Sequence, residues 1–237
     1  MNLIWDLPDH SPPPSLQLAG GWTRETLQFS DRTLHLWCPA DTDAVLEHQL
    51  STGDDTDPFW CYLWPTARIL AQQVLTAKSP LPQRVLEAGC GIGLVGLAAL
   101  AAGVSNVTFQ DLQSAAVELA LHNAQTNGFA ARAVGQVADW RAPSDDVFDW
   151  ILASDILYDR SLHRPLLKFL EAVIPPNRTR PTAPSIWIGD PGRSEAEDFL
   201  NLAKKPFHIE LFDANDRQMK HPLRGQYQRL VLRPYAQ

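Results

Sequence analysis

Cysteine is scarce in this sequence. The 237 residues include three cysteines, Cys38, Cys61 and Cys90, which are widely separated. Three scattered cysteines do not form the disulfide framework of a small secreted domain, and none belongs to a CxxC pair of the kind that binds metal. The seven histidines show no ligand spacing either, so we expect no metal site. This composition fits a reducing compartment, and we predict a cytoplasmic location.

Long apolar runs and an excess of positive charge are also missing. No run approaches the roughly 20 apolar residues of a membrane-spanning helix. Residues 1–20 lack the basic and apolar segments of a signal peptide. The chain holds 20 lysine and arginine residues against 27 aspartate and glutamate residues, a net charge of −7. Because nucleic acids require a basic surface, we expect neither a nucleic acid nor a membrane as a partner.

Hydrophobic residues are plentiful, at 45% of the chain, which is enough for one domain with a full core. From residue 83 onward, strand and helix patterns alternate. The predicted helices lie at 93–102, 113–126, 160–173 and 194–203, and the predicted strands at 84–88, 106–110, 132–137, 148–154, 184–189, 207–213 and 227–233. This alternation predicts an α/β fold, a Rossmann-like three-layer sandwich around a seven-stranded, mostly parallel sheet. The last two strands lack an intervening helix, so we expect an antiparallel hairpin at one edge.

The first 56 residues do not follow this alternation. An irregular, proline-containing arm over 1–20 precedes alternating segments at 26–29 and 34–37, which flank a polar turn and predict a β-hairpin. A helix over 43–50 and an acidic linker over 51–58 follow. We therefore divide the chain into an N-terminal arm with a hairpin extension, residues 1–56, and a main domain, residues 57–237. A second proline-rich stretch, 174–184, predicts a mobile loop in the main domain.

The most informative stretch is VLEAGCGIGLVG at residues 85–96. A short apolar strand contains Glu87 and is followed by Gly89, Gly91 and Gly93 and then by a small, apolar helix. Glycines there let the backbone turn sharply and approach a ligand, and the helix start offers unpaired N–H groups. The stretch also matches the GxGxxG dinucleotide pattern, so an NAD-binding oxidoreductase stays an alternative. Glu87 favours S-adenosylmethionine, whose amino-acid part is cationic, over a pyrophosphate.

Acidic side chains accompany four successive predicted strands, at Glu87, Asp111, Asp139 and Asp155. Ligands of open parallel sheets bind outside the carboxyl ends of the strands, where Asp111 is placed to accept both hydroxyls of a ribose. A single aspartate at such a position often caps a helix, but four of them beside a glycine loop favour a binding site. Trp64 directly precedes a predicted helix over 66–76, where it either packs that helix on the sheet or forms a wall of the cofactor site.

At these positions the chain resembles the class I, seven-strand S-adenosylmethionine-dependent methyltransferases. Within them it is similar to the lysine methyltransferases with a D-x-x-Y motif, here DILY at 155–158. The pieces PFW at 58–60, WP at 64–65 and GDPGR at 189–193 most resemble the electron-transfer-flavoprotein β-subunit lysine methyltransferases and their bacterial relatives, some of which are labelled nicotinamide N-methylases. The resemblance covers about residues 57–193.

The resemblance implies roles for the matching residues. Asp155 and Tyr158 are implied to be catalytic and to face the methyl acceptor. Asp190 and Arg193 form a turn that is as readily structural, so neither is counted as catalytic. S-adenosylmethionine, which becomes S-adenosylhomocysteine, is implied to contact Trp64, Glu87, Gly89, Gly91, Gly93, Asp111, Leu112, Asp139, Trp140 and Ser154.

The implied partner is a protein that bears the target lysine. Two other readings stay open. A small amine or a pyridine is the nearest alternative acceptor, and an aromatic nitrogen needs no deprotonation. A non-catalytic, cofactor-binding interaction module is the third reading, against which the intact set of Glu87, Asp111, Asp155 and Tyr158 argues.

Overall fold

The computed structural model describes residues 11–13, 16–52, 58–77, 81–142, 144–174 and 184–235. Most of the predicted arm over 1–20, residues 53–57 of the predicted linker and residues 175–183 of the predicted proline-rich loop lie outside these ranges. None of the described helices is long and apolar enough to cross a membrane.

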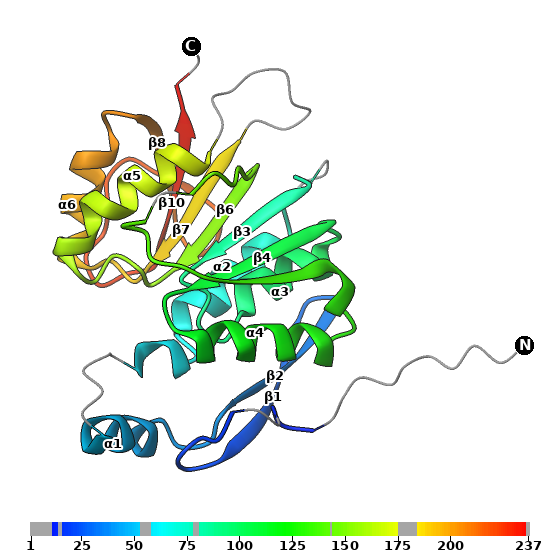
Figure 1. Ribbon diagram of the computed structural model, residues 1–237. Coiled ribbons are helices and arrows are strands. Elements are labelled where there is room, and N and C mark those ends of the chain that lie inside the picture. Colours follow the sequence, from blue (N-terminus) through cyan, green and yellow to red (C-terminus); the bar gives the residue numbers. More distant parts are fainter. Residues whose placement is uncertain are drawn as a thin grey trace, which may run out of the picture.

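A central sheet organises the described chain, with strand order β5-β4-β3-β6-β7-β10-β8-β9 (Figure 1). Strands β3 to β7 pair in parallel, whereas β10 runs antiparallel between β7 and β8. The bounds are β3 Arg84–Ala88, β4 Asn106–Asp111, β5 Ala133–Val137, β6 Trp150–Ser154, β7 Ser185–Asp190, β8 Phe207–Phe212, β9 Gln218–Met219 and β10 Gln228–Pro234. The predicted α/β fold with a mostly parallel sheet is therefore confirmed.

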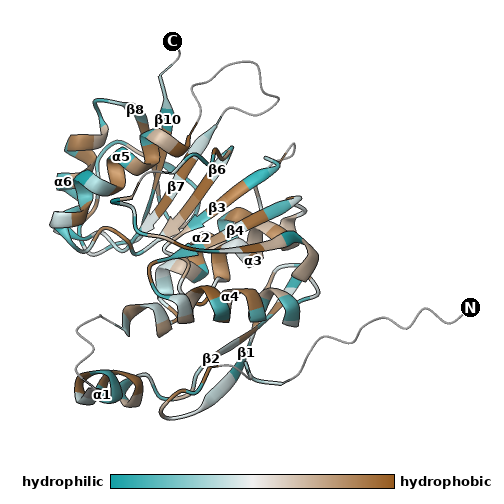
Figure 2. Cartoon of the chain, viewed as in Figure 1, coloured by the Kyte–Doolittle hydropathy of each residue, from teal (hydrophilic) through white to brown (hydrophobic). Residues whose placement is uncertain are grey.

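Helices cover both faces of this sheet, as the three-layer prediction requires (Figure 1). One face carries α2 Pro65–Leu75, α3 Leu94–Ala102 and α4 Ser114–Thr126, and the other carries α5 His163–Val173 and α6 Ser194–Ala203. Alternate strand residues divide between the two layers. Val85 and Leu152 join the first core, and Leu86 and Ile151 join the second. In Figure 2 the hydrophobic colour accordingly runs along the inner strands of the sheet.

The C-terminal edge differs from the prediction in detail. The strands predicted at 207–213 and 227–233 do pair antiparallel, as β8 and β10, but the returning strand β10 inserts next to β7 and leaves β8 outside it. An eighth strand, β9, pairs with β8 through Leu211 and Phe212. A strand of two residues is too short to show any hydrophobic period, so the sequence pattern gave no sign of it.

The N-terminal hairpin is formed by β1, Trp22–Phe29, and β2, Arg32–Pro39, and is followed by α1, Thr42–Thr52. Its register pairs Phe29 with Arg32 across a two-residue turn. Leu27, Leu34 and Leu36 are buried in the same hydrophobic core as α2, α3 and α4. The hairpin thus packs into the core of the main domain.

Two asparagines, Asn123 in α4 and Asn127 directly after it, attach the hairpin to the main domain. Asn127 accepts from the backbone N–H of His35 at 2.9 Å and donates to its carbonyl at 2.6 Å. Asn123 does the same for Trp37, at 2.7 and 3.1 Å, and also donates to the carbonyl of Ile92 in the glycine loop at 3.0 Å. The two amides satisfy the unpaired edge of β2 much as a neighbouring strand would.

Replacement of Asn123 by alanine is expected to lower the free energy of unfolding by about 2–4 kcal/mol, because it leaves buried backbone groups of Trp37 and Ile92 without partners. Thermal unfolding followed by circular dichroism measures this loss. Asn201 on the exposed side of α6 accepts a hydrogen bond from Lys204 and provides a matched control, since Asn201→Ala is expected to change stability by less than about 0.5 kcal/mol. Equal midpoints for the two variants would refute the linking role of Asn123.

Candidate functional site

A cavity of about 430 Å³ opens at the carboxyl ends of the parallel strands. It is lined by the glycine loop, by the ends of β4, β5 and β6, and by the aromatic segment before α2. The sequence-predicted site residues that line it are Trp64, Glu87, Gly89, Gly91, Asp111, Leu112, Asp139, Trp140, Ser154, Asp155 and Tyr158. The fold thus gathers into one cavity residues that are nearly 100 positions apart in the chain. Gly93 is the predicted residue that the lining does not include.

Two glycines that line the cavity occupy positions where any other residue would be strained and crowded. Gly89 and Gly91 have φ angles of +65° and +49°. A Cβ on Gly89 would lie 2.9 Å from Ile156, and one on Gly91 would lie 3.0 Å from the carbonyl oxygen of Trp60. Both the backbone conformation and the lack of space therefore require glycine. Gly93, at φ +87°, serves packing instead, because a Cβ there would lie 2.7 Å from that of Ala120 on α4.

Glu87 is buried beneath the loop, and its two carboxylate oxygens accept the backbone N–H groups of Val95 and Gly96 at 3.1 and 2.9 Å. These N–H groups belong to the first turn of α3 and have no partner within the helix, and a negative charge is favoured at this end of a helix. Burial nevertheless raises the pKa of Glu87 to about 8. The side chain thus stabilises the start of α3 while it also lines the cavity.

Asp111 is the last residue of β4, and its carboxylate binds the backbone of the glycine loop. Its oxygens accept the N–H groups of Gly91 at 3.0 Å and of Gln113 at 3.1 Å. Desolvation raises its pKa. Each carboxylate oxygen can accept more than one hydrogen bond, so Asp111 keeps acceptor capacity toward the cavity. The next residue, Leu112, exposes 55% of its surface at the same rim.

Asp139 and Trp140 follow β5. Arg141 binds the Asp139 carboxylate with Nε at 2.9–3.0 Å and Nη2 at 2.6 Å, and the hydrogen bond from Arg141 lowers the pKa of Asp139. The Trp140 ring lies 3.5 Å from the position that a Cβ of Gly89 would take. This part of the cavity therefore presents a flat aromatic wall beside a bent, side-chain-free backbone.

Aromatic side chains form the opposite rim. Phe59 lies in a 3-10 turn, η1, Pro58–Cys61. Its ring contacts those of Tyr158 and Trp64 edge-on, with centroids 5.5 and 6.2 Å away. Tyr62 and Trp64 are 5.5 Å apart, and the indole N–H of Trp64 donates to the carbonyl of Phe59 at 3.0 Å. Trp64 thus lines the cavity and immediately precedes α2, and Tyr158 meets the same cluster from the far side.

Asp155 follows β6 directly and has an unusual backbone. Its φ is +60°, a left-handed conformation that aspartate tolerates better than most residues. The carboxyl group is 6% exposed, and Oδ1 accepts from Arg193 Nη1 at 2.8 Å. The helix-cap alternative does not apply, because Asp159 caps the following 3-10 turn, η3, Arg160–Leu162. Asp155 is therefore a buried carboxylate that faces the cavity.

Arg193 and Asp190, which the sequence reasoning left outside the catalytic pair, belong to the same cluster. Asp190 is fully buried at the end of β7, and its Oδ1 accepts the N–H groups of Gly192 and Arg193 at 2.7 and 2.9 Å. This is the Asp-Pro-Gly turn that the sequence predicted. The long arginine side chain, however, leaves the turn and reaches Asp155, a contact that no sequence spacing could reveal.

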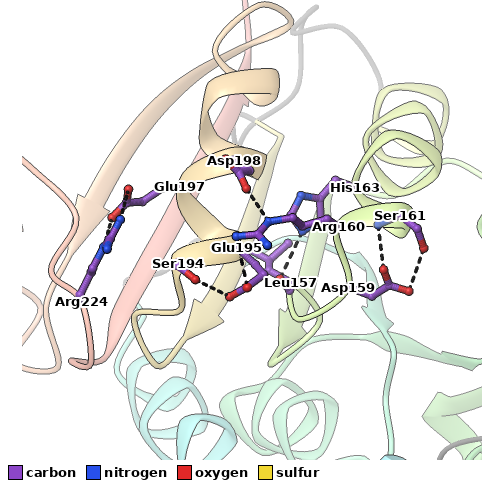
Figure 3. Close-up of polar contacts among 10 residues, drawn as sticks. All are labelled: Leu157, Asp159, Arg160, Ser161, His163, Ser194, Glu195, Glu197, Asp198 and Arg224. Atoms are coloured by element: carbon purple, nitrogen blue, oxygen red, sulfur yellow. Dashed lines mark hydrogen bonds and ion pairs between the residues drawn. The ribbon is translucent and has the colours of Figure 1, made fainter.

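The loop that carries Asp155 and Tyr158 is fastened to α6 (Figure 3). Arg160 binds Asp198 at 2.6 Å and Glu195 at 3.3 Å. His163, buried at the start of α5, donates to the carbonyl of Leu157 at 3.2 Å. These contacts restrain the part of the cavity wall that contains Asp155 and Tyr158.

The residues of the cavity fit S-adenosylmethionine. Among the described lining residues, the acidic ones are Glu87, Asp111, Asp139, Asp155 and Asp159, and the basic one is Arg141, already bound to Asp139. Such a lining suits a cationic ligand and disfavours the pyrophosphate of NAD. The glycine backbone, Asp111 and Trp140 offer surfaces for an amino-acid chain, a ribose and a flat base, respectively.

Comparison with known sequences agrees with this geometry. A model of a lysine methyltransferase family matches residues 46–205, a range that includes the cavity lining from Phe59 to Leu162 and reaches past Arg193. The electron transfer flavoprotein β subunit lysine methyltransferase of Danio rerio is 32% identical over 162 residues, which are 68% of this chain and 60% of that protein. Its namesake in Homo sapiens is 26% identical over 141 residues, or 59% and 52% of the two chains. The chain thus spans 60% or less of the length of these curated relatives.

Solved structures show the same fold. The N-methyltransferase NodS of Bradyrhizobium japonicum superposes with a TM-score of 0.55 at 15% identity, covering 72% of this chain and 97% of that one. A TehB-like methyltransferase of Corynebacterium glutamicum gives 0.52 at 18% identity, with 80% and 94% covered. Since the family model matches most of the chain and its residues form the described cavity, the chain belongs to the lysine methyltransferase family.

Proposed function

We propose that the protein is an S-adenosylmethionine-dependent N-methyltransferase that acts on the side chain of a lysine in a protein substrate. The observation that carries this proposal is Asp155, a carboxylate buried in the same cavity as the glycine loop and flanked by aromatic rings. The relatives named as lysine methyltransferases support the choice of acceptor.

The sulfonium of S-adenosylmethionine supplies an already activated methyl group. The chain's own task is therefore to align an amine nitrogen with that methyl group and to keep water out. Gly89 and Gly91 bring the backbone close to the amino-acid part of the cofactor, Asp111 accepts the ribose hydroxyls, and Trp140 and Leu112 border the base. In this arrangement the acceptor amine enters between the Phe59–Tyr158 pair and Asp155.

Asp155 binds the incoming lysine as an ammonium ion and orients it. The neutral amine that attacks the methyl group costs about 4 kcal/mol to form at neutral pH, since a free lysine has a pKa near 10.4. Desolvation among the aromatic rings reduces this cost, and the proton leaves to water. Cation–π contacts with Trp64 and Tyr62 add about 0.5–2 kcal/mol for a positively charged group. Asp155 is thus a binding and orienting group, and Tyr158 packs beside the amine.

The three cysteines are free and buried in the described structure. Because free thiols persist in reducing compartments, we propose the cytoplasm as the place of action.

Asp155→Asn is expected to lower kcat/KM for a lysine substrate by about 100-fold, because the ammonium loses a charged, desolvated partner. Asparagine tolerates the left-handed backbone at this position, so the fold is kept. The affinity for S-adenosylhomocysteine, measured by calorimetry, is expected to change by less than about threefold. Asp146→Asn, on an exposed loop outside the cavity lining, serves as the control with unchanged kinetics. Full activity of the Asp155 variant would rule out its role.

Asp111→Asn is expected, in contrast, to weaken the binding of the cofactor. Loss of the negative charge weakens the hydrogen bonds to the ribose, so the dissociation constant of S-adenosylhomocysteine rises about 10- to 100-fold. Calorimetric titration measures the constant, and thermal unfolding checks that the glycine loop still folds. An unchanged constant in a folded variant would place the ribose elsewhere.

The acceptor class is tested by methyl transfer from labelled S-adenosylmethionine into a lysate of the source cell. We expect label in protein that yields methyllysine on hydrolysis, and its loss with Asp155→Asn. Label confined to the small-molecule fraction would instead establish the metabolite methyltransferase. Tight binding of the cofactor without transfer to either fraction would favour the non-catalytic module.

A further inference from the structure

We infer that Arg193 is a positioning residue of the acceptor site. Asp190 holds Arg193 in place, and Arg193 in turn orients the Asp155 carboxylate, so that two buried carboxylates share one guanidinium. The inference deepens the proposed function and rests on it, since it assigns to this cluster the recognition of a primary ammonium rather than a neutral ring nitrogen.

The geometry brings three charged groups together from two strand ends and a helix start. Arg193 Nη1 lies 2.8 Å from Asp155 Oδ1 and 3.6 Å from Asp190 Oδ2. The side chains of Asp155 and Asp190 are 6% and 0% exposed, and that of Arg193 is 23% exposed. At this burial, charge–charge interactions are strong and each group depends on its partner.

The backbone around Arg193 leaves little freedom. Gly192 has a φ of +83°, and a Cβ there would lie 2.4 Å from the carbonyl oxygen of Leu223. The carbonyl of Gly192 accepts the N–H of Gly225 at 2.9 Å, and Asp190 accepts the N–H of Arg193 itself. Because hydrogen bonds hold the turn on both sides, the direction of the Cα–Cβ bond of Arg193 is fixed.

The cluster has unused acceptor capacity. Asp155 Oδ2 and Asp190 Oδ2 are buried, and no hydrogen bond to either is formed within the described part of the chain. A buried oxygen of this kind is costly unless a donor reaches it. Asp155 lines the cavity, whereas Asp190 does not. An ammonium that enters the cavity brings three donors to the Asp155 carboxylate, while a pyridine nitrogen has none to offer.

Two carboxylates around one guanidinium also leave one negative charge uncompensated. A cationic amine completes the balance, and a neutral acceptor does not. Arg193 therefore has two effects on recognition: it fixes the position of Asp155, and it lowers the pKa of that carboxyl against the effect of burial, which favours the ionised form that binds a cation.

The pH dependence follows from the groups that face Asp155. These are Arg193 from the turn before α6, Asp190 from β7, Thr66 from α2 and, at longer range, Tyr227 before β10. Burial raises the pKa of Asp155, Asp190 adds to this, and Arg193 and Thr66 oppose it. Removal of the guanidinium raises the pKa further, so Asp155 becomes protonated over a wider range of acidic pH and loses its affinity for an ammonium.

The test compares Arg193→Gln with wild type by kcat/KM for a lysine-containing protein substrate between pH 6 and 9. Deprotonation of the substrate affects both enzymes equally, so the ratio of variant to wild type isolates Asp155. We expect this ratio to rise about tenfold from pH 6 to pH 9, as Asp155 regains its charge. A merely structural loss gives a ratio that does not vary with pH, and that result would overturn the inference.

Two further variants serve as controls. Arg193→Lys keeps the charge without the planar fork, so its activity is lower but its ratio to wild type stays constant with pH. Arg224 binds Glu197 of α6 at 2.8 Å, and 71% of the Arg224 side chain is exposed (Figure 3). Arg224→Gln is therefore expected to match wild type at every pH. If Arg193→Gln does not fold, Arg193→Met takes its place in the same comparison with the same expected rise, and a ratio that does not vary with pH overturns the inference.

A double-mutant cycle on thermal unfolding tests the pair without reference to catalysis. Asp155→Asn and Arg193→Gln are each expected to lower the midpoint by about 3–8 °C, and the double variant by clearly less than their sum. Additive losses would refute the pairing. A wild-type protein that transfers no methyl group to lysine would refute the proposed function, whereas the cycle would still report on the contact.

Discussion

The glycine loop keeps its shape because two carboxylates bind its backbone from opposite sides. Glu87 accepts N–H groups at the start of α3, and Asp111 accepts the N–H of Gly91. Without these bonds, the left-handed φ angles of the loop would lack the contacts that stabilise them. The rest of the cavity depends on this arrangement, since Trp140, Ile156 and the Trp60 backbone all approach within contact distance of the bent loop. The same acidic residues that favour a cationic ligand are thus also structural supports.

The acceptor side follows a different principle. Its parts come from η1, the end of β6 and the start of α6, which are joined by side chains rather than by a sheet. This side of the cavity can therefore be altered without disturbing the glycine loop, since loops on a fixed scaffold tolerate change better than the elements that support them.

Sequence patterns predict the glycine-loop side of the cavity more completely than the surroundings of Asp155. Glycines, strand-end acids and the alternation of strands and helices are local patterns, and they point to Glu87, Gly89, Gly91 and Asp111, which line the cavity. Gly93 shares that spacing but packs against Ala120. The sequence around Arg193 indicates a turn and no more, because its contact with Asp155 spans 38 residues and depends on β7 lying next to β6. The place of β10 inside the sheet escaped prediction for the same reason, since neighbour relations between strands are not written in local periodicity.

Asn123 makes a single buried amide serve both the hairpin and the glycine loop, through Trp37 and Ile92. This link has an evolutionary consequence. A shortened gene that lost the hairpin would expose to water the apolar surface that Leu27, Leu34 and Leu36 now share with α2, α3 and α4. The hairpin and the domain that follows it are thus expected to be inherited as one unit.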